Sequence, residues 1–277
     1  MNCEVRIVKF EGIFTSQFTI HSSPFTIHMI HWLIQSSTNS PDFHVGAPLS
    51  GVLHPGEQKK LATLKTEKRR RDWLLGRWTA KQLIQSVVQH DLNQTLALPS
   101  IEVRNGSKGD PIVDGQLAVV NDQLPVANLQ SFLTLSISHA HGHAFCAVVE
   151  RPCWPIGADI EWIERRSTTF VEDYFTLEEQ ALVGQAAGEM RDVLVTAVWS
   201  AKEAVLKALH LGLTVDTCYV ECLIAPLAER PSTWTPFAIR CNNGRLPQPA
   251  PQFTGWWRTW ENFVLTLVVQ EESQLVE

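Results

Sequence analysis

The chain has 277 residues, of which 44% are hydrophobic and 19% are charged, and its formal net charge is -6. This ordinary globular composition excludes a disordered chain and allows one large domain or two modest ones. The acidic balance argues against a nucleic-acid partner, and no window reaches the roughly 18 uninterrupted apolar residues that a membrane span needs. The six cysteines form no CxxC pair and are interpreted as reduced thiols, so we expect a cytoplasmic protein, which we take to be monomeric.

The first half of the chain predicts a lobe of mixed helices and strands. Residues 1–30 show no clear period and stand as an N-terminal extension of unknown order. The elements expected after it are, in chain order, a strand in IHMIHWLI, two helices between His54 and Val88 that join near Thr66, a strand in IEVR, a turn in NGSKGDP, and strands ending in FLTLSISHAHGHAFCAVVE with a turn at Gly142.

The second half repeats this order after a break between Pro152 and Pro155. Its expected elements are a strand in PIGADIEWI, a helix from Thr176, a long helix stopped by Gly212, and strands in CYVECLI, FAIR and FVLTLVV. We therefore predict an α+β fold of two similar lobes, 31–152 and 153–277, with a cleft between them. The repeat is expected in pattern, without identity between the halves. The tryptophans near the C-terminus are expected in the core: Trp256, Trp257 and Trp260.

Two carboxylates alternate in the strand PIGADIEWI. Asp159 and Glu161 are two residues apart, so they share one face of the strand while apolar residues take the other. Adjacent carboxylates repel and raise each other's pKa, and a hard cation such as Mg2+ relieves that repulsion. A solvated strand face is the alternative interpretation.

Charged residues also interrupt the apolar helix VWSAKEAVLKALHLGL. Glu203 and Lys207 are four residues apart and share a face, which by itself is an ordinary ion pair. Lys202 lies about 100° around the helix from Glu203 and is a weaker candidate for a site. Thr176 and Glu179 have the spacing of a capping box, so we assign Glu179 a structural role.

The pair formed by IGADIE and, further along, WSAKEAVLK resembles the paired signature of the 4'-phosphopantetheinyl transferases, in the larger two-lobed type that activates peptide and polyketide synthases and aminoadipate reductases. Upstream features of that family also occur in order, namely HPGEQKK, LLGR, KGDP and SISH. Two positions depart from the family pattern: Asp110 stands where a lysine is usual, and Ser136 where an asparagine is usual.

The resemblance implies that the chain transfers 4'-phosphopantetheine from coenzyme A to a serine of an acyl or peptidyl carrier protein and releases adenosine 3',5'-bisphosphate. Asp159, Glu161 and Glu203 would hold Mg2+, or Mn2+ in its place, against the pyrophosphate. Glu203 would also be a candidate base, and Lys207 would stabilise charge on the leaving phosphate. The carrier could belong to fatty acid, polyketide or nonribosomal peptide synthesis.

The resemblance further implies contacts to the coenzyme A nucleotide from basic and polar residues of the first lobe. These residues are Lys60, Arg71, Lys108, Gly109, Ser138 and His139. For Arg71, which ends the run KRRR, an exposed solvated position is the alternative.

Three other interpretations stay open. Asp110 motivates a non-catalytic module that holds coenzyme A or a carrier protein, and the same carboxylates would also suit a Mg2+-dependent nucleotide hydrolase. His139, His141 and His143 alternate as zinc ligands do, but no fourth ligand is evident and Gly142 indicates a turn.

Overall fold

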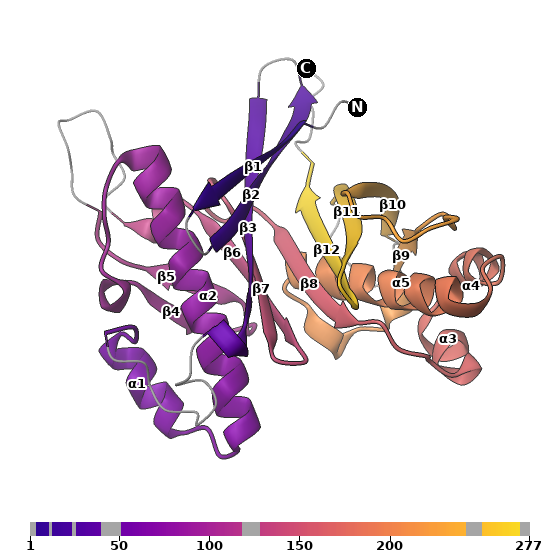
Figure 1. Cartoon of the computed structure of the whole chain (residues 1–277), viewed down its shortest axis with the longest axis horizontal. Helices are drawn as coiled ribbons and strands as arrows, with labels where there is room; N and C mark the ends of the chain where they lie inside the picture. The colour runs from indigo at the N-terminus through magenta and orange to yellow at the C-terminus, as the bar shows by residue number, and fades with distance from the viewer. Residues whose placement is uncertain are drawn as a thin grey trace. The chain divides into compact units, whose positions relative to one another are not determined.

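The computed structural model describes residues 4–10, 13–23, 26–39, 51–117, 128–241 and 251–271. The chain divides into two compact units, Met1–Trp154 and Pro155–Glu277. Each unit contains an antiparallel sheet with a long helix packed on it, so the predicted α+β fold is confirmed (Figure 1). None of the described helices has the length and hydropathy needed to cross a bilayer. The five cysteines within the described ranges are free thiols.

The first unit is built on a five-stranded sheet in the order β1-β2-β3-β7-β6, with β4 and β5 paired separately. Its elements are β1 Glu4–Phe10, β2 Ile13–Ser23, β3 Thr26–Ser36, α1 Pro55–Ala62, α2 Glu67–Leu92, β4 Glu102–Asn105, β5 Pro111–Asp114, β6 Thr134–Ala140 and β7 His143–Val149. Residues 1–30, which the sequence left without assigned order, thus contribute β1, β2 and the start of β3.

Turn and cap residues of the first unit follow the sequence expectation. Thr66 caps α2, because its side chain accepts a hydrogen bond from the backbone N–H of Arg69. His141 and Gly142 join β6 to β7 with φ angles of 45° and 74°, a left-handed pair that suits a two-residue hairpin turn. Helix α2 packs on β3, β6 and β7, and its apolar side chains fill the core against that sheet.

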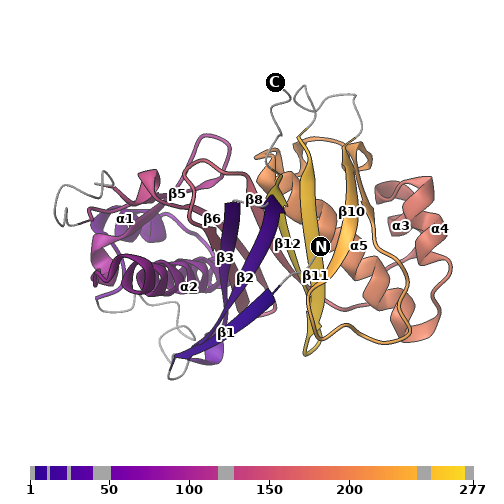
Figure 2. The same cartoon turned by 90° about the horizontal axis from the view of Figure 1, so that it is seen from above.

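The second unit has the sheet order β8-β12-β11-β10-β9. Its elements are β8 Ile156–Trp162, α3 Thr168–Tyr174, α4 Leu177–Val183, α5 Gly188–Ala208, β9 Val220–Leu223, β10 Thr235–Cys241, β11 Phe253–Trp260 and β12 Phe263–Gln270. Helix α5 runs along one face of this sheet (Figure 2). The predicted stop at Gly212 was wrong: α5 ends at Ala208, and His210 with φ of 53° has already left the helical conformation.

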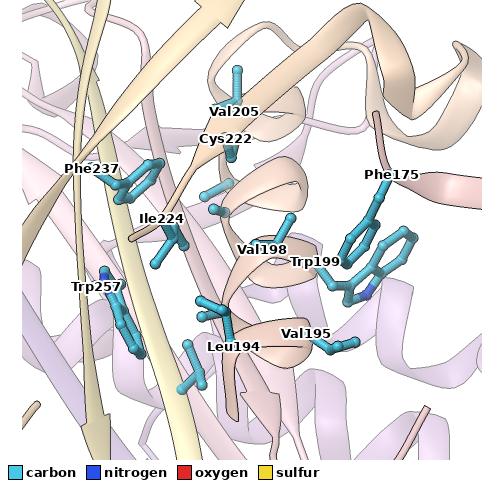
Figure 3. Packing of buried hydrophobic residues seen from close by; sticks show 14 of the residues in the cluster. Phe175, Leu194, Val195, Val198, Trp199, Val205, Cys222, Ile224, Phe237 and Trp257 are labelled. Carbon is cyan, nitrogen blue, oxygen red and sulfur yellow. The ribbon is translucent and has the colours of Figure 1, made fainter. Parts of the chain in front are cut away.

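The core of the second unit lies on both sides of α5. Leu194 lies on the side of α5 that faces Trp257 and the sheet, while Trp199 packs beside Phe175 on the other side of the helix (Figure 3). Trp256 and Trp257 are each only 1% exposed, which confirms them as core residues, whereas Trp260 is half-buried.

The two units repeat one order of elements. β3, α1, α2 and β4 to β7 in the first unit follow one another as β8, α4, α5 and β9 to β12 do in the second. The strand that begins the repeated order, β3 or β8, pairs antiparallel with the strand that ends it, β7 or β12. With the long helices matched, the prediction of no identity between the halves was wrong, because WTAK at 78–81 corresponds to WSAK at 199–202.

The lysine of each WTAK or WSAK sequence makes the same buried connection. Lys81 is fully buried and pairs with Glu57, whose Oε1 accepts the backbone N–H of Val103 on β4 at 2.9 Å. Lys202 is fully buried and pairs with Glu179 at 2.8 Å, and Oε1 of Glu179 accepts the N–H of Cys222 on β9 at 2.7 Å. Both glutamates close capping boxes, at the N-termini of α1 and α4, which confirms the structural role predicted for Glu179.

Candidate active site

The candidate site of the second unit begins on strand β8. Asp159 and Glu161 alternate along this strand, and Asp159 is paired in register with Thr266 of β12. Asp159 is 1% exposed, whereas the side chain of Glu161 is 22% exposed. A solvated strand face is therefore excluded for Asp159, because this carboxylate is enclosed by protein.

Helix α5 lies close against β8, and Gly157 allows this approach. A Cβ atom on Gly157 would lie 1.8 Å from the carbonyl oxygen of Ala204, so no side chain fits between the strand and the helix here. Glu203, next to Ala204, and Lys207, one turn further, thereby face the carboxylates of β8. The contact depends on the absence of a side chain at position 157.

The structure brings the predicted carboxylates and lysine together. Asp159, Glu161 and Glu203 each offer one oxygen, and these oxygens all lie within 4.8 Å of one another. Nζ of Lys207 donates to Oδ1 of Asp159 at 2.6 Å and to the carbonyl oxygen of Ala158 at 3.2 Å. The lysine thus pairs with Asp159 on the neighbouring strand.

A chain of hydroxyl groups holds the second oxygen of Asp159. Ser200 donates from Oγ to Oδ2 of Asp159 at 2.7 Å, and Thr266 donates from Oγ1 to Oγ of Ser200 at 2.9 Å. Ser200 and Thr266 are both fully buried. Both oxygens of Asp159 are therefore hydrogen-bonded, and the orientation of its carboxylate is fixed.

Asp159, Glu161 and Glu203, called the acidic cluster, repel one another. Burial, followed by the charges of Asp159 and Glu203, raises the pKa of Glu161 to about 8 despite Arg166 and Lys207. Burial and Asp159 raise the pKa of Glu203 to about 7, opposed by Lys207, Arg166 and a hydrogen bond with Trp199. Carboxylates that resist ionisation in this way gain from a divalent cation, and three carboxylate oxygens form a donor set that suits Mg2+ or Mn2+.

The nucleotide-contact residues predicted in the first unit lie at several places. A cavity of about 230 Å³ beside α1, α2 and β4 is lined by Lys60 together with Arg77 and Arg104. The other predicted residues do not line it: Arg71 lies on α2 with Glu67 at 3.9 Å, Lys108 and Gly109 form the β4–β5 turn, and Ser138 and His139 belong to β6.

Several residues of these sites were not predicted from the sequence. Ser200 and Thr266 come together only through the strand register, and Arg166, which lies 3.4 Å from Glu161, follows β8 in an irregular segment. Arg77 is 7% exposed, and its Nε has no hydrogen-bond partner among the described residues. The one signal in the sequence was the position of Arg77 directly after apolar residues in LLGR, where a buried arginine would be unusual because arginine is seldom buried without a role.

Comparison with known proteins finds one family match, which lies within the second unit. Residues 155–240 match the family model of the 4'-phosphopantetheinyl transferase superfamily. No curated protein matches the chain in sequence.

Among solved structures, the chain is similar to holo-(acyl-carrier-protein) synthases, at TM-scores too low to support an assignment. The enzyme from Bacillus anthracis, solved with coenzyme A (3',5'-ADP), has 21% identity over 44% of this chain and 95% of its own, with a TM-score of 0.34. The enzyme from Thermotoga maritima has 18% identity over 54% and 78%, with a TM-score of 0.33. That from Plasmodium yoelii has 19% identity over 43% and 91%, with a TM-score of 0.31. The family match covers β8 and α5, which carry the clustered carboxylates and lysine, so residues 155–240 of this chain resemble the 4'-phosphopantetheinyl transferase superfamily.

Proposed function

We propose that the protein transfers 4'-phosphopantetheine from coenzyme A to a serine of an acyl or peptidyl carrier protein, in a Mg2+-dependent reaction. The observation that carries this proposal is the convergence of three carboxylates and Lys207 at the contact of β8 with α5. The superfamily match over this segment supports it.

The chemistry is an in-line displacement at phosphorus. The serine oxygen forms a bond to the β-phosphorus of coenzyme A, and the bond from that phosphorus to the bridging oxygen breaks. Adenosine 3',5'-bisphosphate leaves with the bridging oxygen, and the serine proton passes to a carboxylate, for which Glu203 is the candidate. Such transfers depend mainly on positioning and charge neutralisation.

Each side chain would have a separate task. Asp159, Glu161 and Glu203 would hold Mg2+, which supplies positive charge to the pyrophosphate oxygens when it is bound. Lys207 would stabilise the negative charge that develops on the leaving phosphate. Ser200 would keep Asp159 in its orientation through the hydrogen bond from Oγ.

The test is mass spectrometry of purified apo carrier proteins after incubation with the protein, coenzyme A and Mg2+, with and without a chelator. We expect a gain of one phosphopantetheine on at least one carrier, lost with the chelator. Glu203→Gln should abolish this gain, while Glu172→Gln, on the exposed face of α3, should not change it.

The same assay separates the rival functions. Coenzyme A that binds without modifying any carrier would favour the non-catalytic module suggested by Asp110. Cleavage of coenzyme A without a carrier would favour the hydrolase. Retained transfer by Glu203→Gln would contradict the role given to that residue.

The nucleotide contacts predicted in the first unit form a separate part of the proposal. Lys60, Arg77 and Arg104 line the cavity together with two carboxylates, Glu57 and Glu102, and Glu57 is already paired with Lys81. The excess of positive charge supports a role in binding an anion. We expect Lys60→Ala to raise KM for coenzyme A about tenfold with little effect on kcat, because binding of a remote phosphate is uniform through the reaction. Arg71→Ala, on the exposed part of α2, gives the matched comparison, and equal effects of the two would contradict the preference for Lys60.

A further inference from the structure

A second group of metal-ligating side chains lies within the first unit and has no part in the proposed transfer. His31 belongs to β3, Asp91 to the last turn of α2, and Glu150 follows the end of β7; together they are called the His31 cluster. One ligand atom from each lies within 4.8 Å of the other two. The cluster forms because β3 and β7 pair with His31 opposite Val148, and α2 packs on both strands.

Hydrogen bonding in the His31 cluster is incomplete. Nε2 of His31 lies 2.5 Å from Oε1 of Glu150 and 3.9 Å from Oδ2 of Asp91. An imidazole nitrogen carries one hydrogen at most, so it can serve only one of these two acceptors. Oδ2 of Asp91 is buried and has no hydrogen-bond partner among the described residues. A buried acceptor left without a partner is costly and calls for an explanation.

The charges of the cluster are also unbalanced. Glu150 and Oδ2 of Asp91 face the imidazole of His31, whose side chain is 5% exposed, while His90 contacts only Oδ1 of Asp91. Among the described residues no lysine or arginine forms an ion pair with either carboxylate. Burial is the main cause that raises the pKa of Asp91, and the charge of Glu150 adds to it, while His90 and His31 oppose it. One more positive charge at Nε2 would satisfy both carboxylates at once.

We propose that the His31 cluster binds a divalent transition-metal ion, with Zn2+ as the best match. Zinc accepts both imidazole nitrogen and carboxylate oxygen, and a water molecule would complete its fourth position, whereas Mg2+ and Ca2+ prefer oxygen ligands alone. Binding would replace the hydrogen on Nε2 of His31, release that proton to solvent, and give Oδ2 of Asp91 its missing partner.

The surroundings of the cluster suit a structural ion. Nδ1 of His90 lies 2.6 Å from Oδ1 of Asp91, so His90 holds the carboxylate by the oxygen that the ion would not use. The ligands come from β3, from the end of α2 and from the end of β7, and an ion would join these three elements. The ion would therefore stabilise the first unit without entering the chemistry at Asp159.

The experiment uses the full chain, stripped with a chelator and returned to buffer containing excess Mg2+. Titration with Zn2+ in a calorimeter, in the background Glu161→Gln/Glu203→Gln, removes competition from the acidic cluster of the second unit. We expect one Zn2+ per chain and a rise in Tm that depends on Zn2+ concentration. Asp91→Asn and His31→Gln should each abolish both effects, and His90→Ala should weaken binding roughly tenfold.

Controls make the test independent of folding and activity. Asp72→Asn changes an aspartate on the same helix outside the cluster and should bind Zn2+ as the background protein does. X-ray absorption at the zinc edge should show imidazole and oxygen ligands without sulfur. Circular dichroism checks the fold of each variant. If His31→Gln does not fold, Zn2+ binding by the nearly isosteric Asp91→Asn tests the proposal. Failure of the background protein to bind Zn2+, equal binding by folded Asp91→Asn, or a sulfur ligand would each overturn the proposal.

Discussion

At the scale of single residues, the candidate site stands out because its acidic groups are held together against their own repulsion. Glu161 and Glu203 have pKa values near 8 and 7 when no cation is bound, and Asp159 is enclosed with both oxygens hydrogen-bonded. Two predictions follow from this arrangement, one about pH and one about the hydroxyl that holds Asp159.

In metal-free protein, Glu161 should make the fold less stable as pH rises. Its folded pKa of about 8 lies above the usual 4.5, so between these values the folded state binds protons that the unfolded state releases, and stability falls. We expect Glu161→Gln to match wild type near pH 5 and to exceed it by about 2 kcal/mol near pH 8.5. Urea unfolding with a chelator measures this, with Glu172→Gln as the control. If the difference in unfolding free energy between Glu161→Gln and wild type did not change with pH, the raised pKa of Glu161 would be refuted. Added Mg2+ should stabilise wild type more than the variant.

Ser200→Ala should weaken metal use without unfolding the protein. Losing the hydroxyl removes the donor to Oδ2 of Asp159 and the acceptor of Thr266, so the carboxylate is less well oriented. We expect the Mg2+ concentration for half-maximal transfer to rise about 10- to 100-fold. Thr196→Ala is the matched control, because that buried hydroxyl donates to the backbone carbonyl oxygen of Asp192 on its own helix and not to Asp159. Equal Mg2+ requirements in the two variants would show that Ser200 has no positioning role.

At the scale of elements, the sequence predicted the residue pairs that lie within one helix or strand, but not the contacts that join distant segments. Asp159 with Glu161, and Glu203 with Lys207, could be placed because a strand repeats every two residues and a helix about every four. The bond from Ser200 to Asp159 and the pairing of Lys202 with Glu179 join distant segments, so no local pattern reveals them. Lys202 was ranked low for its position around the helix, and in fact it is a buried structural residue.

The buried lysine of each unit should be essential for stability. Lys202→Met leaves Glu179 buried without its cationic partner, and removing one member of a buried pair typically costs about 3–5 kcal/mol. We expect guanidinium unfolding to show a decrease of this size in the free energy of unfolding of Lys202→Met. The double variant Lys202→Met/Glu179→Gln should recover part of it. Lys81→Met should behave alike in the first unit, while Lys59→Met on the exposed face of α1 should not. Destabilisation by less than about 1 kcal/mol would mean that the pair contributes little.

At the scale of the whole molecule, the two units share a plan but differ in their chemical groups. Gln82 stands where the second unit has Glu203, directly after the shared lysine. Strand β3, the counterpart of β8, contains no aspartate or glutamate, so the first unit lacks the counterparts of Asp159 and Glu161.

This difference predicts that activity cannot be moved from one unit to the other. Gln82→Glu/Glu203→Gln should be as inactive in carrier modification as Glu203→Gln alone, because a single carboxylate on α2 has no partners on β3. Gln82→Glu by itself should keep wild-type transfer and fold. Activity in the double variant would mean that the first unit supplies further metal ligands.

The shared lysine also bears on ancestry. Three identities in four residues at the same point of two helices, together with an equivalent buried glutamate and an equivalent antiparallel pair of strands, are most simply explained by a duplicated ancestral gene. Such a duplication and fusion would leave both copies under selection to fold, but only the second under selection to keep the carboxylates proposed as metal ligands. Across descendants of that fusion, Lys81 and Lys202 should vary equally little, whereas position 82 should drift freely and position 203 should not.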